Sequence, residues 1–201
     1  MSDLERLLVH PVITRLARAL EERPGVEVAA PEEARRAAVA LLVRVTKGKV
    51  VEVLLIQRAS YQGDPWSGHV ALPGGRHEPE DQTLWDTAAR ETLEEIGIDL
   101  RQYGRALGAL DDLQPRTPSL PPLVVRPFVV LLTGDHEIVL SSELTAAFWV
   151  PLSALEDPAA TREVALELES ATRKFSSFQV GQRTVWGLTE RILRQFLSLL
   201  P

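Results

Sequence analysis

The sequence predicts an α+β fold in a single globular domain that is preceded by a helical arm. Two observations carry this prediction: β-rich runs share the chain with only a few helical segments, and no repeat, low-complexity tract or linker divides it. The 201 residues suit one domain with an extension, and 45% hydrophobic and 25% charged residues are typical of a soluble globular protein. We place the arm at residues 1–30 and the domain at residues 31–201.

The arm is predicted from apolar residues at helical spacing between residues 4 and 22. Pro11 is expected to divide this segment into two helices, and Pro24-Gly25 to end it. We expect the arm to pack on the domain.

The domain is predicted to be built mainly from strands. The β-rich runs are Ala37–Val45, Val50–Arg58, Arg105–Leu110, Leu123–Leu132, Glu137–Leu140, Ala147–Val150, Glu163–Leu168 and Phe175–Val180. The first two are joined by TKGK, which indicates a hairpin, and the proline-rich residues 115–122 indicate a rigid loop. A helical turn at Leu152–Leu155 and a final amphipathic helix at Thr189–Leu199 complete the pattern.

One helix, predicted over Leu84–Ile96, carries an unusual concentration of charge. At about 100° per residue, its apolar residues occupy an arc of roughly 80°, and three glutamates lie on the opposite side. The apolar residues are Trp85, Ala89, Leu93 and Ile96, and the glutamates are Glu91, Glu94 and Glu95. Asp86 and Glu94 are each four residues from Arg90, a spacing that suits ion pairs with it.

Three carboxylates on one helix face repel one another unless something binds them. Pro73-Gly74-Gly75, upstream of the helix, suits a tight turn that brings bare backbone carbonyls to the same face. Carboxylates plus a carbonyl are suitable ligands for a hard divalent cation such as Mg²⁺. The alternative is a solvated acidic face, and spacing alone does not decide between the two.

The stretch from Gly75 through Asp81 to Arg90-Glu91-Thr92-Leu93-Glu94-Glu95-Ile96-Gly97-Ile98 resembles the Nudix box, G-x5-E-x7-R-E-U-x-E-E-x-G-U. Every fixed residue of the second half, R-E, E-E and G, is in place. In the first half Asp81 replaces the usual glutamate, and one residue is inserted before Arg90. The resemblance implies an α/β/α sandwich with a mixed sheet. It also implies Mg²⁺- or Mn²⁺-dependent hydrolysis of a nucleoside diphosphate linked to another group.

Carried over residue by residue, the resemblance makes Glu91 and Glu95 the principal metal ligands and Glu94 a further one. It assigns Arg90 to orienting Glu91 and the Gly75 carbonyl to completing the shell. Glu143, in LSSELTAAFWVPL, resembles a glutamate outside the box that relatives use as base or ligand, the alternative being a surface charge.

Further segments resemble the coenzyme A pyrophosphatase branch of the family: LLIQRAS, Gly68–Gly75, PPLVVRPFV and WGLTERIL. Where that branch usually has a basic residue, four positions before Gly68, this chain has Asp64. ADP-ribose, dinucleotides and oxidised nucleotides therefore stay open as substrates.

Four residues are candidates for substrate binding: Arg58, Arg76, Trp66 and His69. Arg58 and Arg76 suit phosphate, and Trp66 suits stacking on a base. The alternatives are a surface ion pair for Arg58, a structural histidine at His69 and a packed loop aromatic at Trp66.

The general composition excludes several other kinds of protein. The formal net charge of −6 argues against broad attraction to nucleic acid, and the absence of cysteine excludes disulfides, thiolate zinc sites and thiol nucleophiles. Residues 1–12 lack a signal-peptide pattern, and the most apolar stretch, Ala37–Ile56, is interrupted by charges. We expect a cytoplasmic protein that acts on a small-molecule nucleoside diphosphate, and a homodimer is compatible with the sequence. A nucleotide-sensing module without hydrolysis stays as the alternative function.

Overall fold

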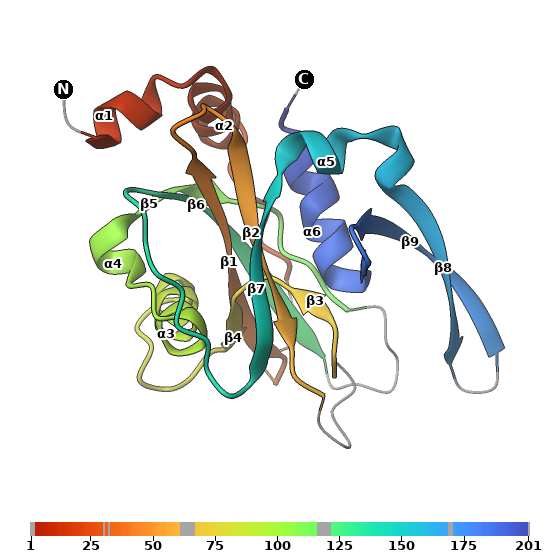
Figure 1. The fold of residues 1–201 in the computed structure, drawn as a ribbon. Coiled ribbons are helices and arrows are strands. Elements are labelled where there is room, and N and C mark those ends of the chain that lie inside the picture. The colour runs from red at the N-terminus through yellow and green to blue at the C-terminus, as the bar shows by residue number, and fades with distance from the viewer. Residues whose placement is uncertain are drawn as a thin grey trace.

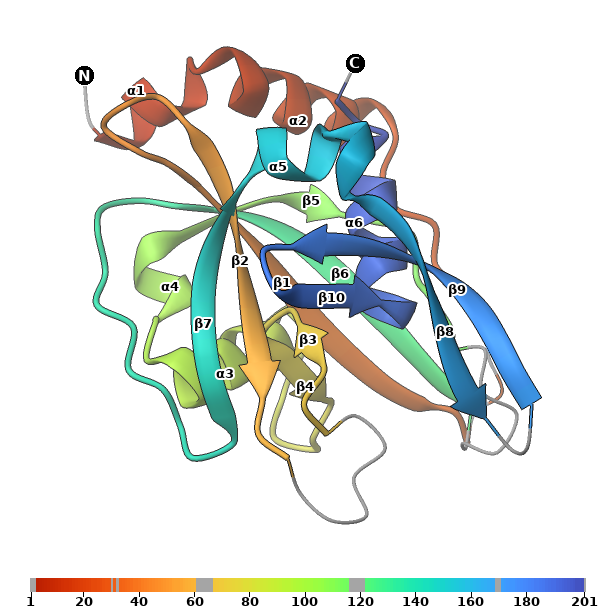
Figure 2. The ribbon, with the colours of Figure 1, turned by 45° about the vertical axis from the view of Figure 1, so that its right-hand side comes forward.

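The computed structural model describes residues 3–29, 31, 33–60, 67–115, 122–168 and 171–200. A twisted sheet lies at its centre, with α3 and α4 on one face and α2, α5 and α6 with a smaller sheet on the other (Figures 1 and 2). The helices are α1 (Asp3–Leu8), α2 (Pro11–Glu22), α3 (Leu84–Ile96), α4 (Leu100–Tyr103), α5 (Leu152–Glu156) and α6 (Gly187–Leu197). The predicted α+β class and α/β/α sandwich are confirmed.

The main sheet is mixed, as predicted. Its path runs β3-β2-β1-β6-β5, with β4 paired to β1 and β7 paired to β2. Its strands are β1 (Arg35–Val45), β2 (Val51–Arg58), β3 (Val70–Ala71), β4 (Gly74–Arg76), β5 (Gly104–Ala109), β6 (Leu123–Leu132) and β7 (Leu144–Pro151). Only the β1–β6 pair is parallel among the pairings of the described strands.

The long strand β1 changes partner along its length. Its C-terminal end pairs with β2, through Val43 opposite Val53, and its N-terminal end pairs with β4, through Ala38 opposite Gly75. The short segment Gly74–Arg76 is therefore built into the sheet and held by its ladder of hydrogen bonds.

Alternating residues of β1, β2 and β6 supply a hydrophobic core on each face of the sheet. On one face, Leu42, Leu54 and Val130 pack with Ala88 and Ile96 of α3. On the other, the sheet packs with α2, α5 and α6 and with the smaller sheet, whose strands are β8 (Thr161–Leu168), β9 (Ala171–Val180) and β10 (Arg183–Trp186). Strand β10 was not predicted from the sequence.

The N-terminal arm forms two helices divided at Pro11, as predicted. Pro11 is the first residue of α2, where its missing N–H costs no helical hydrogen bond. Ile13, Leu16 and Leu20 are fully or almost fully buried in the same core as the sheet. The division of the chain at residue 30 stays a prediction.

Segment 23–28, which follows α2, is tied to the domain by a buried ion pair. Asp112 accepts hydrogen bonds from Arg126 Nε at 2.8 Å and from the Val28 N–H at 3.1 Å. The side chains of Asp112 and Arg126 are 1% and 14% exposed. The Asp112 carboxylate thus balances the charge of Arg126 and also accepts a hydrogen bond from the backbone of the segment that follows α2.

We predict that Asp112→Ala lowers the free energy of unfolding by about 3 kcal/mol, because it leaves the largely buried Arg126 charge with only the exposed Glu27 carboxylate as a partner. Chemical denaturation measures this change. Arg18→Ala is the control, since the Arg18–Glu22 pair is 76% and 61% exposed and should contribute little. Equal, small effects of both substitutions would contradict the prediction.

Helix α3 has the predicted bounds, but its buried face is rotated from the predicted one. Leu93 is 44% exposed, whereas Thr92 is fully buried and Glu95 is only 5% exposed. The small Ala88 and Thr92 side chains let the helix lie against β1 and β4, and this close packing outweighs the larger apolar side chain. The expectation that Leu93 belongs to the packed face was wrong.

Residues 137–140, predicted as a strand, form none. The Val139 N–H donates to Ile96 O at 3.0 Å, and the Ser141 N–H donates to Glu95 O at 2.9 Å. These bonds satisfy carbonyls that the end of α3 leaves open, so the segment caps a helix instead of joining the sheet. None of the described helices is long and apolar enough to cross a membrane.

Candidate active site

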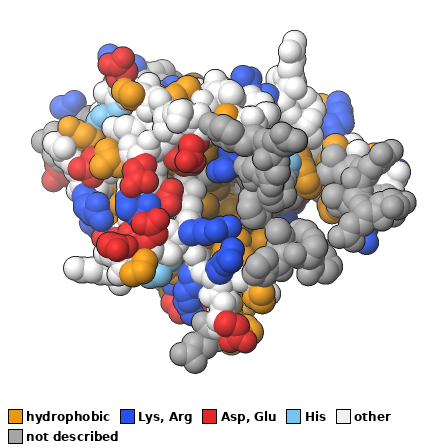
Figure 3. Space-filling view, turned by 90° about the horizontal axis from the view of Figure 1, so that it is seen from below, with side chains coloured by type: hydrophobic (Ala, Val, Ile, Leu, Met, Phe, Trp, Pro, Cys, Tyr) orange, Lys and Arg blue, Asp and Glu red, His pale blue; other side chains and the backbone are white. Residues whose placement is uncertain are grey.

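Helix α3 is fixed at both ends by local sequence. Thr83 and Asp86 form a reciprocal capping box at its start, and Gly97 ends it with a left-handed φ of 74°. The capped helix presents its acidic residues next to β4. Figure 3 shows the molecule from below. On the face in view, acidic side chains gather in one area, beside basic side chains.

Two glutamates of α3 lie against the glycine turn. The Gly74 N–H donates to Glu95 Oε2 at 2.9 Å. A Cβ atom added to Gly75 would lie 2.3 Å from the carboxyl carbon of Glu91, so only glycine permits this approach. Glu91, Glu95 and the backbone of 74–75 therefore converge on one place.

Burial disfavours the charged forms of both carboxylates. It raises the pKa of Glu95 to about 7, and the charges of Glu91 and Glu143 act in the same direction, against the Gly74 N–H and Arg58. Burial also raises the pKa of Glu91, against the opposing charge and hydrogen bond of Arg90. A cation placed between the two carboxylates would relieve this cost.

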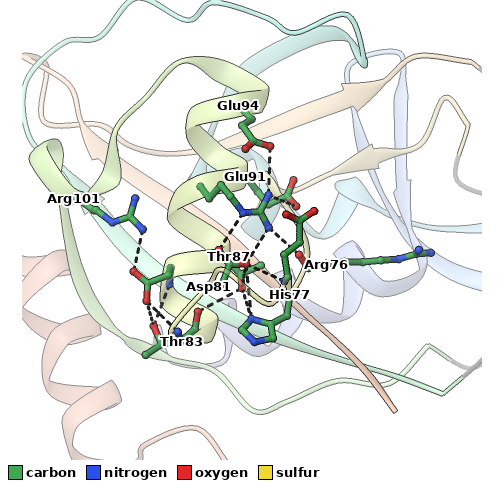
Figure 4. Close-up of polar contacts among 11 residues, drawn as sticks. Arg76, His77, Asp81, Thr83, Thr87, Glu91, Glu94 and Arg101 are labelled. Atoms are coloured by element: carbon green, nitrogen blue, oxygen red, sulfur yellow. Dashed lines mark hydrogen bonds and ion pairs between the residues drawn. The ribbon is translucent and has the colours of Figure 1, made fainter. Parts of the chain in front are cut away.

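Arg90 is the centre of a network of ion pairs. Its partners are Asp81, Glu91 and Glu94, which are labelled in Figure 4. Its Nε and Nη2 donate to Asp81 at 3.1 and 3.0 Å, and its Nη1 donates to Glu91 Oε1 at 3.0 Å. Hydrogen bonds from Arg90 hold the pKa of Asp81 well below its usual range. The aspartate at the first acidic position of the box thus anchors Arg90, despite its shorter side chain and the inserted residue.

The expected ion pair between Asp86 and Arg90 is absent from the described contacts. The carboxylate of Asp86 is held by the N-cap Thr83 and by Arg101 Nη2 at 3.0 Å. The role of Asp86 in the capping box explains the difference, because N-cap geometry turns the side chain back toward the start of the helix.

Glu94 stands apart from the other two glutamates of the box. Its side chain is 60% exposed and pairs with Arg90 Nη1 at 3.4 Å. Among the described residues, no three acidic or histidine side chains are grouped closely enough to hold a metal ion by themselves. The convergence expected for three glutamates is thus seen for Glu91 and Glu95, and ligation by Glu94 stays a prediction.

The donor set nevertheless fits a hard divalent cation. It consists of two carboxylates with raised pKa values and a backbone strand without a side chain to block it. Mg²⁺ is commonly held by one or two carboxylates, with water and substrate phosphate in its remaining positions. The carboxylate oxygens of Glu91 and Glu95 and the carbonyl oxygen of Gly75 would hold the cation.

Arg58 and Glu143 lie on the same side of the sheet as Glu95. The charge of each affects the pKa of Glu95, Arg58 lowering it and Glu143 raising it. Arg58 ends β2, and the carbonyl of Glu143 accepts from the Ala59 N–H at 2.7 Å, so the two segments are joined. Their positions are compatible with the predicted roles, which stay predictions.

The other predicted substrate residues are less closely grouped. The Arg76 carbonyl accepts from Arg90 Nη2 at 3.0 Å, while its side chain extends away from the carboxylates (Figure 4). His69 contacts Trp186 edge-to-face, with ring centroids 4.7 Å apart. Trp66 lies outside the described residues.

The sequence interpretation missed two residues that contact the network. Thr87 is fully buried and donates to Asp81 Oδ2 at 2.9 Å, and His77 Nδ1 lies 2.9 Å from Thr87 Oγ1. Both occupy unspecified positions of the box pattern. The available signal was the unusual aspartate with the inserted residue, because a shorter acid needs a different set of partners.

The sheet, the capped acidic helix and the glycine turn define a hydrolase-like site built on an α/β/α sandwich. The family model described as the NUDIX domain matches residues 34–171. The chain therefore belongs to the Nudix family, and the prediction of a Nudix pyrophosphohydrolase is confirmed.

Several known proteins are similar to this chain. An uncharacterised protein of Schizosaccharomyces pombe is 40% identical over 126 residues, which span 61% of this chain and 38% of that protein. The uncharacterised Nudix hydrolase NudL of Photorhabdus laumondii is 30% identical over 80% of this chain and 82% of its own length. A MutT/nudix family protein from Enterococcus faecalis matches the fold with a TM-score of 0.55 and 18% identity, covering 100% of this chain and 80% of that one.

Proposed function

We propose that this enzyme hydrolyses the pyrophosphate bond of a nucleoside diphosphate derivative, with coenzyme A or one of its derivatives as the leading substrate and Mg²⁺ or Mn²⁺ as cofactor. The observation that carries the proposal is the convergence of Glu91, Glu95 and the Gly75 backbone. Bound there, the cation supplies positive charge that neutralises the diphosphate and activates water. We place this activity in the cytoplasm.

The residues of the chain divide the work as follows. Glu91 and Glu95 hold the cation, and Arg90 keeps Glu91 oriented through its 3.0 Å contact. Arg58 supplies a positive charge facing the phosphates. Glu143 is the proposed base that would accept the proton of the attacking water, because it resembles the glutamate outside the box that relatives use and its segment is joined to the end of β2.

Resemblance to the coenzyme A branch supports the substrate, and Asp64 is the departure that makes a panel necessary. Purified protein with Mg²⁺ is incubated with coenzyme A, ADP-ribose, diadenosine polyphosphates and an oxidised nucleotide, and products are identified by mass. Formation of phosphopantetheine and 3′,5′-ADP is expected. Cleavage of another compound alone would replace coenzyme A as substrate, and tight binding without product would favour a sensing module.

The raised pKa of Glu95 predicts a pH-dependent stability. Because the folded value of about 7 lies above the unfolded value of about 4.3, the folded state binds the extra proton between them. Stability of the metal-free protein should therefore fall as pH rises from about 4.5 to 7.5, and Glu95→Gln should flatten this slope.

Added Mg²⁺ should raise the melting temperature more at pH 8 than at pH 6, since it competes with the proton. Thermal melts from about pH 4.5 to pH 8 measure both effects, and a slope unchanged in Glu95→Gln would contradict the assignment of the raised pKa to Glu95.

A further inference from the structure

Asp81, the anchor of Arg90, depends on a hydroxyl group from inside α3. Its Oδ2 accepts from Thr87 Oγ1 at 2.9 Å, from the Glu78 N–H at 3.1 Å and from Arg90 Nη2 at 3.0 Å. The Asp81 side chain is 4% exposed and Thr87 is fully buried. The orientation of the carboxylate is thus fixed by three donors away from solvent.

The proton positions in this cluster follow from counting donors. A threonine hydroxyl has one proton, and we assign it to the 2.9 Å bond with Asp81, which is shorter than the 3.4 Å contact with Thr83 O. The contact of 2.9 Å between His77 Nδ1 and Thr87 Oγ1 must therefore carry its proton on the histidine nitrogen. His77 thus donates to Thr87, and Thr87 donates to Asp81 (Figure 4). Asp81 accepts from Arg90 as well, so the carboxylate connects Thr87 with Arg90.

This chain reaches a residue that would hold the cation. Arg90 uses Nε and Nη2 for Asp81 and Nη1 for Glu91, so rotation of its guanidinium group would move the Glu91 contact as well. Glu91 in turn lies against Gly75. Outer partners of metal ligands commonly set ligand orientation and affinity.

We propose that Thr87 is a positioning residue for the cation site: its hydroxyl, with His77 behind it, holds Asp81 so that Arg90 orients Glu91. This inference rests on the proposed function. It also explains how this chain accommodates a shorter acid and an inserted residue, because the hydroxyl fixes an aspartate that has fewer rotamers and less reach than glutamate.

A second buried threonine on the same helix supplies a matched comparison. Thr92, also fully buried, donates to Ala88 O at 2.7 Å, a bond within its own helix. Thr87→Val and Thr92→Val remove the same hydroxyl from equally buried positions, but only the first leads to Arg90. Thr87→Ser keeps the hydroxyl and serves as the conservative rescue.

The test measures Mn²⁺ affinity, from the electron paramagnetic resonance signal of the free ion, together with kcat and KM on the substrate found in the panel. Thr87→Val should weaken Mn²⁺ binding about ten- to a hundredfold and lower kcat more than it raises KM. Thr87→Ser should restore most of the affinity, and Thr92→Val should stay within about twofold of the unmodified protein. Equal Mn²⁺ affinities for folded Thr87→Val and Thr92→Val would overturn the proposal.

His77→Ala removes the exposed partner of the Thr87 hydroxyl. This variant tests the proposal if Thr87→Val does not fold. It should weaken Mn²⁺ binding several-fold, and unchanged affinity would then overturn the proposal. The affinity measurement needs no turnover. If no diphosphate is cleaved but Thr87→Val still weakens Mn²⁺ binding relative to Thr92→Val, the proposed hydrolysis fails while the positioning role stands.

Discussion

Glu95→Gln should lower kcat by at least about a hundredfold. The estimate is a lower bound, because loss of an outer partner of a metal ligand already costs about 10- to 100-fold and Glu95 is proposed to contact the ion itself. The amide keeps the shape of the side chain but removes the charge that the cation needs. Steady-state kinetics and Mn²⁺ titration measure the two consequences.

The same substitution should leave the fold intact at pH 8. Glu95 is 5% exposed and its charged form is disfavoured by burial, so a neutral side chain should not destabilise the metal-free protein. Glu80→Gln, at an exposed position between β4 and α3, is the matched control and should retain full activity. Full activity of Glu95→Gln on a confirmed substrate would remove the basis of the mechanism.

Gly75→Ala is expected to abolish tight metal binding while sparing the fold. Its new Cβ would lie 2.3 Å from the Glu91 carboxyl carbon, and the carboxylate, at the end of a flexible side chain, can move aside. Mn²⁺ affinity should fall about a hundredfold, while the free energy of unfolding changes by about 1 kcal/mol or less. Titration and denaturation of the same preparation measure both.

The neighbouring glycine provides the opposite outcome. A Cβ on Gly74 would meet the Ala38 carbonyl oxygen at 2.3 Å, and its φ of 146° is strained for any other residue. Backbone cannot move aside, so Gly74→Ala should destabilise the protein by about 3 kcal/mol or more. If Gly75→Ala were as destabilising as Gly74→Ala, the expectation that the Glu91 side chain moves aside for a Cβ at position 75 would be wrong.

Features encoded by neighbouring residues were predictable from the sequence. The bounds of α3 are correct because Thr83, Asp86 and Gly97 define its ends locally. Its buried face is not, because the close approach of α3 to β1 and β4 is a property of the packed molecule that helical spacing does not contain.

The same distinction applies to the site. The box pattern predicts that Glu91, Glu95 and Gly75 lie in one region. In the structure, Glu91 lies against Gly75, and Glu95 accepts a hydrogen bond from the Gly74 N–H. The chain of contacts through Asp81 depends on a loop folding back onto α3, and the end of α3 recruits residues 139–141 as a cap. The first joins residues six to ten positions apart through a loop whose turn geometry hydrophobic periodicity does not describe. The second brings in partners distant in sequence, which periodicity cannot identify.

Because Gly75 is a rung of the central sheet opposite Ala38, the place where the ion would sit exists before any ligand arrives. Little ordering entropy then opposes binding, and the Gly75 amide should exchange its hydrogen as slowly as the rest of the ladder. The backbone part of the cation site is lost only when the sheet unfolds, so the free energy that opens it should equal that of global unfolding.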